Sequence, residues 1–174
     1  MKIVLNGCYG NFGLSYNAQA AYIMAYGGIP YFYQDISTYT PDNKKDICYK
    51  RLNIREVNEM VGKAPFLLCT SEYQAPIIYH KPEAVIDFYY IDRTDPILIS
   101  MVEVMGSEFV SGPFAALYVA EVPDGTLYRI DHHDGMETIV TQYDEKLIVA
   151  KSNNLLTEAR AKIEDLWQRI KPKT

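Results

Sequence analysis

The sequence has no long apolar run. None of its 174 residues belongs to an apolar stretch near the ~18–20 residues that a bilayer-spanning helix requires. The apolar part of residues 1–7 is also too short for the core of a signal peptide. We therefore expect a cytoplasmic protein with no membrane partner.

Cysteine and positive charge are also scarce. The chain has three cysteines, Cys8, Cys48 and Cys69, and they lie far apart in the sequence. An odd number of distant cysteines indicates reduced thiols and not a disulfide framework or a zinc site. The 17 basic and 22 acidic residues give a net charge of −5. General nucleic-acid binders need a basic face, so this class is excluded. We expect no cofactor.

Tyrosine is abundant, with 15 residues against one Trp and six Phe. A tyrosine side chain combines a flat apolar ring with a polar tip, which suits half-buried strands, interfaces and pockets that stack on aromatic ligands. We expect most of them to lie in strands. The remainder are available for a ligand or a partner.

The apolar periodicity predicts a mixed α/β fold of the α+β class. Ser15 is a candidate helix N-cap, Asn53 with Glu56 forms a capping box, and Asp95-Pro96 opens a helix. Turns at 123–125 and at Asp134-Gly135 predict a three-stranded antiparallel meander. The expected elements are strand 2–6, helix 16–26, strand 29–34, loop 37–46, helix 54–61, strands 66–70 and 84–91, a helix from 96 to Gly106, and strands 115–121, 126–131 and 137–142.

The C-terminal segment 151–174 has the pattern of an amphipathic helix. It holds six basic and three acidic side chains, so it carries +3 while the rest of the chain carries −8. We expect residues 1–150 to form one compact domain on which this helix packs. The alternative is a dimerisation arm that makes a homo-oligomer.

The loop from Asn6 to Ser15 is the most informative segment. It joins the first strand to the first helix and has glycine at every third position. Such a turn points backbone N–H groups outward, and the helix dipole favours an anion there. The alternative is a tight turn whose glycines serve only positive φ angles. The candidate ligand-binding residues are Asn6, Cys8, Tyr9, Gly10, Asn11, Phe12, Gly13 and Ser15.

A dinucleotide site is a weaker interpretation of the same loop. Asp35 lies 22 residues after Gly13, where an acidic residue holds ribose hydroxyls in dinucleotide folds. The spacing is G-x-x-G-x-x-G and not G-x-G-x-x-G, and repeating strand-helix units do not follow. Asp35 stays a candidate ligand residue.

Cys8 lies where helix N–H groups lower a thiol pKa, which makes it a candidate nucleophile. His80, His132 and His133 are candidate bases, but nothing in the sequence brings them to Cys8. A metal site at the two adjacent histidines, with the flanking aspartates 131 and 134, lacks a known ligand spacing. We therefore favour a protein that is not an enzyme and holds no metal.

The cluster Arg93-Thr94-Asp95 follows a predicted strand and opens a helix. An arginine there can fork onto a phosphate or a carboxylate of a ligand. The alternative is an Arg–Asp ion pair between loop and helix. All three residues are candidate ligand contacts.

Two stretches resemble a family of small proteins encoded by phages and prophages. The first matches M-K-[IV]-V-[IL]-N-x-C-[YF]-G-x-F-x-L-S over residues 1–15. The second carries R-x-D-P-x-L from Arg93 to Leu98, Val102-Glu103, Gly106, and V-x-E-[IV]-P-D from Val119 to Asp124. The resemblance implies a phage origin and expression in the cytoplasm of a bacterial host. It implies no particular reaction.

Small acidic phage proteins often act against host defences, and some bind a nucleotide-derived immune signal without cleaving it. We expect this function here, with the first loop and Arg93 on phosphates and tyrosines on the base. One alternative is an inhibitor that binds a host protein through a tyrosine-rich surface. Another is a Cys8-dependent enzyme or a signal-degrading hydrolase.

Overall fold

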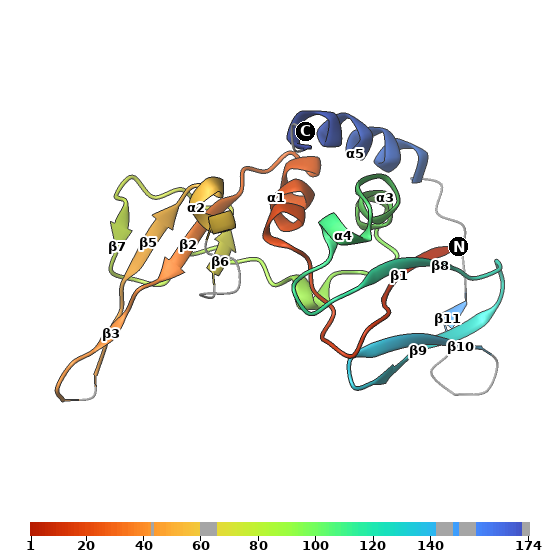
Figure 1. Cartoon of the computed structure of the whole chain (residues 1–174), viewed down its shortest axis with the longest axis horizontal. Coiled ribbons are helices and arrows are strands. Elements are labelled where there is room, and N and C mark those ends of the chain that lie inside the picture. The colour runs from red at the N-terminus through yellow and green to blue at the C-terminus, as the bar shows by residue number, and fades with distance from the viewer. Residues whose placement is uncertain (43, 60–65, 142–147, 150–155, 172–174) are drawn as a thin grey trace. The chain divides into compact units, whose positions relative to one another are not determined.

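The computed structural model describes residues 1–42, 44–59, 66–141, 148–149 and 156–171 (Figure 1). They form a mixed α+β fold, as the sequence predicts. Within the stretch 1–150 that the sequence suggests as one domain, the contacts separate an inserted unit. Unit 1 comprises Met1–Ala25 and Phe88–Thr174, and unit 2 comprises Tyr26–Asp87.

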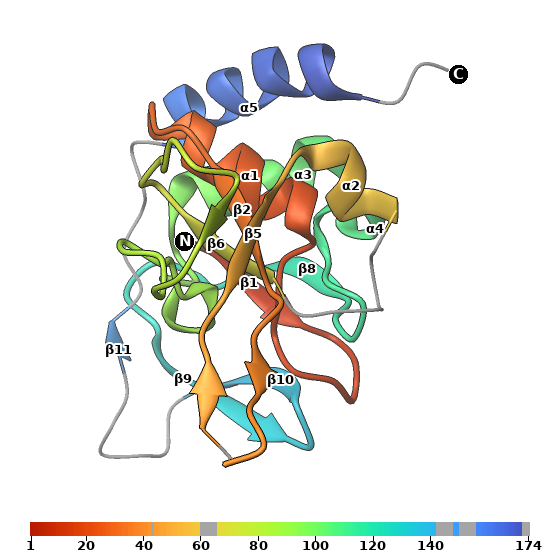
Figure 2. The ribbon, with the colours of Figure 1, turned by 90° about the vertical axis from the view of Figure 1, so that its left-hand side faces the viewer.

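Unit 1 is layered. Figures 1 and 2 show helix α5 on one side of α3, the β1–β8 pair on the other, and the β9–β10 hairpin beyond that pair. The elements of unit 1 are β1 (Lys2–Asn6), α1 (Tyr16–Ala25), η1 (Phe88–Tyr90), α3 (Pro96–Met105), α4 (Ser107–Val110), β8 (Leu117–Glu121), β9 (Leu127–His133), β10 (Met136–Thr141), β11 (Ile148–Val149) and α5 (Leu156–Ile170).

The core of unit 1 includes buried side chains of both β1 and α3. Ile3 and Leu5 of β1 are almost fully buried in a cluster with Val122 and Tyr128, and Leu98 and Met101 of α3 are fully buried as well. Asp95 caps α3 by accepting a hydrogen bond of 2.9 Å from the Leu98 N–H, which confirms the predicted helix start.

Helix α5 packs along α3 of the same chain with its apolar stripe. Ala159, Ile163 and Leu166 are buried, and the Trp167 ring meets Phe109 edge-on at 4.7 Å. The C-terminal helix that the sequence predicts is therefore present, and its apolar stripe packs on α3. Among the helices of the described residues, none is both long enough and apolar enough to cross a bilayer.

The predicted meander is wrong in its pairing. β8 pairs antiparallel with β1 (Ile3 opposite Ala120), whereas β9 pairs with β10 and with β11. The turn at Asp134-Gly135 is present, and both residues have positive φ angles of 50° and 88°. Turn residues specify a local change of direction, but they do not specify which distant strand β8 meets.

Unit 2 is built on one antiparallel sheet in the order β6-β2-β5-β7. Tyr33, Tyr49, Cys69 and Ile78 form its buried cluster. The predicted capping box is confirmed, because the Asn53 and Glu56 side chains each accept the other's backbone N–H. The elements of unit 2 are β2 (Tyr31–Asp35), β3 (Thr38–Tyr39), β4 (Lys45–Asp46), β5 (Tyr49–Leu52), α2 (Ile54–Glu59), β6 (Phe66–Cys69) and β7 (Ile77–Ile78).

Two predictions in this region are wrong, and two strands were not predicted. The predicted loop 37–46 contains the β3–β4 hairpin, and strands β5 and β7 were not predicted. The predicted strand 84–91 is irregular and ends in η1, where Tyr89 and Tyr90 both face solvent. Adjacent side chains of a half-buried strand point to opposite faces, so this exposure is incompatible with a strand.

Candidate functional site

Asn6 holds the first loop (residues 6–15) in its shape. Its side chain is fully buried, and Nδ2 donates to the carbonyls of Cys8 (3.1 Å), Gly10 and Gly135 (2.9 Å). Its Oδ1 accepts from the Ala116 N–H at 2.8 Å. All of these bonds are internal, so this side chain shapes the loop and does not face a ligand.

Gly10 is required by a close approach of two backbones. A Cβ at residue 10 would lie 1.7 Å from the carbonyl oxygen of Phe114. The positive-φ glycines of the described chain do not include Gly7, Gly10 or Gly13. The alternative that the glycines serve only positive φ angles is therefore wrong for this loop.

The far end of the loop is a capped helix start. Ser15 Oγ accepts a hydrogen bond of 3.1 Å from the Ala18 N–H and donates one of 2.7 Å to the Phe109 carbonyl. The Ser15 N–H donates to the Val110 carbonyl at 2.9 Å. The predicted N-cap is confirmed, and the Ser15 hydroxyl already makes two hydrogen bonds within the chain.

Between these two ends the backbone amides are unused. From Cys8 to Leu14, no backbone N–H has an acceptor in the part of the chain that the structure describes. Tyr9 and Asn11 are exposed to solvent. Unpaired amides beside a helix N-terminus carry partial positive charge, which favours an anion.

A pocket of about 440 Å³ lies between this part of the loop and a facing turn. The loop and the turn are joined at both ends, because Gly112 N–H donates to Gly13 O and Gly7 N–H donates to Ala116 O, each at 2.8 Å. The pocket is lined by Tyr9, Gly10, Asn11, Phe12, Gly13, Leu14, Gly112, Pro113, Phe114 and Ala115.

Arg93 contacts Phe12, one of the residues that line the pocket. Its guanidinium carbon stands 3.1 Å from the centre of the Phe12 ring, and its Nη2 donates to Glu137 Oε1 at 2.9 Å. The predicted Arg–Asp ion pair is wrong, since the partner is a buried glutamate on β10. Burial lowers the pKa of Arg93, and the Glu137 charge partly offsets this shift.

Thr94 and Asp95 serve local structure. Thr94 donates from its N–H and from its hydroxyl to Asp92 Oδ1, at 2.8 and 2.7 Å. Asp95 caps α3 and also accepts from the Tyr22 hydroxyl at 3.0 Å. These contacts explain both residues without a ligand.

Asp35 belongs to unit 2. Its carboxylate accepts from Lys45 Nζ at 2.8 Å and from the Ser37 N–H at 2.9 Å. These hydrogen bonds lower the pKa of Asp35 to about 2, and the bond from Lys45 makes the largest contribution. The carboxylate is thus engaged at the base of the β3–β4 hairpin.

Cys8 has no histidine beside it. Its Sγ contacts Asn6 Oδ1 and the Phe114 carbonyl, both at 3.4 Å, and no described contact joins it to a histidine. His132 lies 3.6 Å from Glu137, and His80 meets the Tyr73 ring. The described residues include no cluster of three or more side chains placed to hold a metal.

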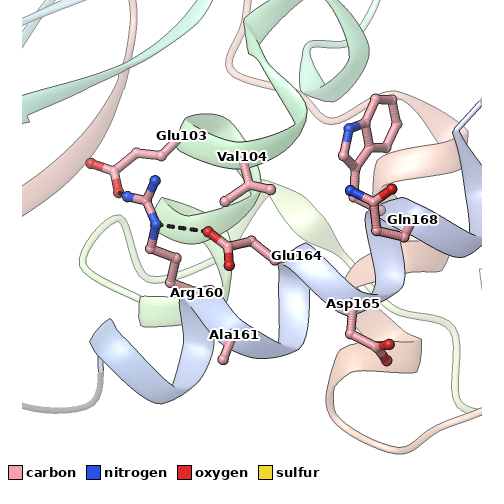
Figure 3. Close-up of a pocket in the computed structure, with 8 residues that line it drawn as sticks. Glu103, Val104, Arg160, Ala161, Glu164, Asp165 and Gln168 are labelled. Carbon is pink, nitrogen blue, oxygen red and sulfur yellow. Dashed lines mark hydrogen bonds and ion pairs between the residues drawn. The ribbon is translucent and has the colours of Figure 1, made fainter.

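A second hollow, of about 690 Å³, lies between α3 and α5 (Figure 3). Arg160 bonds Glu164 at 3.0 Å and Glu103 at 3.3 Å, and Lys2 also bonds Glu103. These charges compensate one another along an exposed helix surface. The hollow therefore offers less for a ligand than the pocket at the first loop.

Sequence reasoning did not select Phe114 or Glu137 as site residues. Pro113 before an aromatic residue is the available signal for Phe114, because proline favours the second position of a turn. For Glu137 there is no local signal, since its partners Asn6 and Arg93 are distant in sequence.

Comparisons with known proteins are negative. The chain matches no protein-family model, no curated protein and no solved structure.

Proposed function

We propose that this chain is a phage-encoded anti-defence protein that binds a small nucleotide-derived immune signal and sequesters it without cleavage. The observation that carries the proposal is the pocket of about 440 Å³ at the first loop, where the amides of residues 8–14 have no acceptor within the described chain. Typical small-molecule sites measure ~300–1,000 Å³.

The anionic part of the ligand binds the loop backbone in this proposal. Amides in series at a helix N-terminus bind phosphate without a cationic side chain. The Arg93 guanidinium lies against the Phe12 ring, and its Nη1 is a buried donor with no partner among the described residues. The Nη2 group of Arg93 donates a hydrogen bond to Glu137, so this contact holds the guanidinium in place beside Phe12.

Sequestration is favoured over turnover by the surroundings of Cys8. An adjacent base is one means of activating a cysteine nucleophile, and Cys8 Sγ contacts only carbonyl oxygens in the described structure. Among the described contacts of Cys8 there is no such base.

Mass spectrometry tests the proposal directly. The protein is produced in bacteria with an active nucleotide-based defence system, purified, and heated to release what it holds. We expect an intact anionic nucleotide in the released fraction. Cys8→Ser is expected to release the same compound in the same amount, whereas a chemically altered compound that disappears with Cys8→Ser identifies an enzyme.

A host-protein inhibitor is the second candidate. Tyr89 and Tyr90 are 59% and 81% exposed and form an edge-on pair at 5.1 Å. Exposed aromatic side chains are typical anchors of protein interfaces. Loss of a captured host protein in Tyr90→Ala, with no small molecule released on heating, would favour this candidate. The homo-oligomer through the C-terminal helix, which the sequence offers as an alternative, also stays a prediction.

A further inference from the structure

Phe114 lies in a hydrogen-bonded turn that lines the pocket. Residues Gly112–Ala115, hereafter the Phe114 turn, are closed by a hydrogen bond of 3.1 Å from the Ala115 N–H to the Gly112 carbonyl. Pro113 stands at the second position, where its fixed φ angle suits a β-turn. The Phe114 ring at the third position is 77% exposed.

The backbone of Phe114 is used by the fold, but its ring is not. Its carbonyl contacts Cys8 Sγ at 3.4 Å and lies against Gly10. Within the described chain, the ring makes no contact with another aromatic ring or with a cation. Because Phe114 both lines the pocket and is exposed, its ring is available to a ligand there.

Tyr9 is the corresponding side chain on the opposite wall. It is 74% exposed, and its hydroxyl has no hydrogen-bond partner among the described residues. Tyr9 and Phe114 both line the pocket, yet no ring contact joins them. Two aromatic rings that border one pocket without packing on each other leave their faces available to a planar group.

We infer that Phe114 and Tyr9 bind the base of the ligand by stacking, while the amides of residues 8–14 bind its phosphates. This inference rests on the proposed function and extends it, since it names Phe114 as a specificity-determining residue. The ligand class is a nucleotide with an accessible planar base. Neither a base without phosphate nor phosphate without a base fills both halves of the pocket.

Calorimetry with defined probes tests this assignment. The probes are pyrophosphate and the four common ribonucleoside diphosphates, each titrated into the full chain. We expect at least one nucleotide to bind tenfold or more tightly than pyrophosphate. Phe114→Leu keeps an apolar side chain but removes the ring, and it is expected to weaken nucleotide binding about tenfold while pyrophosphate binding stays unchanged.

Two variants serve as controls. Phe114→Trp retains a stacking ring and is expected to bind the nucleotide at least as tightly as the original chain. Tyr90→Leu removes an aromatic ring that is 81% exposed outside the pocket lining, and it is expected to change neither affinity. Circular dichroism checks that all variants fold.

The outcomes separate the inference from the proposed function. Unchanged nucleotide affinity in Phe114→Leu overturns the inference, and so does pyrophosphate binding that no nucleotide exceeds; in both cases anion binding by the loop stands. If neither pyrophosphate nor any nucleotide binds, the proposed function and the inference both fail. If Phe114→Leu abolishes capture of a host protein with nucleotide affinity unchanged, a protein-binding role replaces the stacking role.

Discussion

Glu137 accepts a hydrogen bond of 2.9 Å from the backbone N–H of Asn6, at the residue where β1 ends and the first loop begins. The other oxygen of this carboxylate accepts from Arg93, also at 2.9 Å. The Glu137 side chain is 2% exposed. A buried charge of this kind requires a partner and hydrogen bonds, and both are present here. The start of the loop is thus fixed from β10.

Glu137→Gln is expected to destabilise unit 1. The amide keeps an acceptor for one neighbour but removes the charge that compensates Arg93, and breaking a buried pair costs about 3 kcal/mol. Urea unfolding followed through Trp167, which is the single tryptophan and lies in unit 1, measures the change. Glu121→Gln, at an exposed position of β8, is the control and is expected to change stability by less than about 0.5 kcal/mol. Equal effects of the two variants would contradict the assignment.

Gly10→Ala and Gly13→Ala form a matched pair in the first loop. A methyl group at residue 10 meets the Phe114 carbonyl, whereas one at residue 13 finds only Asn11 O at 3.9 Å. We expect Gly10→Ala to lower the free energy of unfolding by about 1–3 kcal/mol. We expect Gly13→Ala to change it by less than about 0.5 kcal/mol.

We expect Gly10→Ala to weaken ligand binding more than Gly13→Ala does, because a methyl group at residue 10 forces apart the loop and the Phe114 turn. Isothermal titration with the compound identified by mass spectrometry compares the two variants. If Gly13→Ala lost as much affinity as Gly10→Ala, the close approach at residue 10 would not be what shapes the pocket.

Asp35 gives a prediction of pH dependence in unit 2. The Lys45 hydrogen bond, followed by those from Ser37, lowers the pKa of Asp35 from 3.8 to about 2. Because the pKa is lower in the folded state, ionised Asp35 stabilises the fold above pH ~4, and this contribution is lost as the pH falls through about 2. Carbon NMR of the carboxyl group is expected to show a midpoint near pH 2.

Lys45→Met is expected to raise that midpoint towards 3.8, since it removes the first cause of the shift. Lys44→Met, one residue away and exposed, is the control and is expected to leave the midpoint in place. A midpoint near 3.8 in the original chain would show that the ion pair is not formed in solution.

Ile163→Ala tests how the C-terminal helix is held. Ile163 is fully buried on the face of α5 that packs on α3, and truncating such a side chain costs about 2–5 kcal/mol. Lys162→Ala, on the exposed face, is expected to cost less than about 0.5 kcal/mol. Urea unfolding read through Trp167 measures both.

The same unfolding midpoint is expected to be independent of protein concentration over a hundredfold range, because α5 packs within its own chain. A midpoint that rises with concentration would indicate that the helix is held by a second copy.

The sequence alone determined the features whose hydrogen bonds close within a few residues. The Ser15 and Asp95 caps, the Asn53–Glu56 box and the Asp134-Gly135 turn each depend on groups no more than four positions apart. Their residue types therefore suffice to predict them, together with the helices that they open.

Only the tertiary structure decided how the site is assembled. The Asn6–Glu137 bond, the approach of Phe114 to Gly10 and the pairing of β8 with β1 all join segments more than 100 residues apart. A local pattern fixes the direction of the chain and the face that it buries. Which distant groups then meet depends on the packing of the whole unit, because backbone amides and buried charges find their partners only when the core closes.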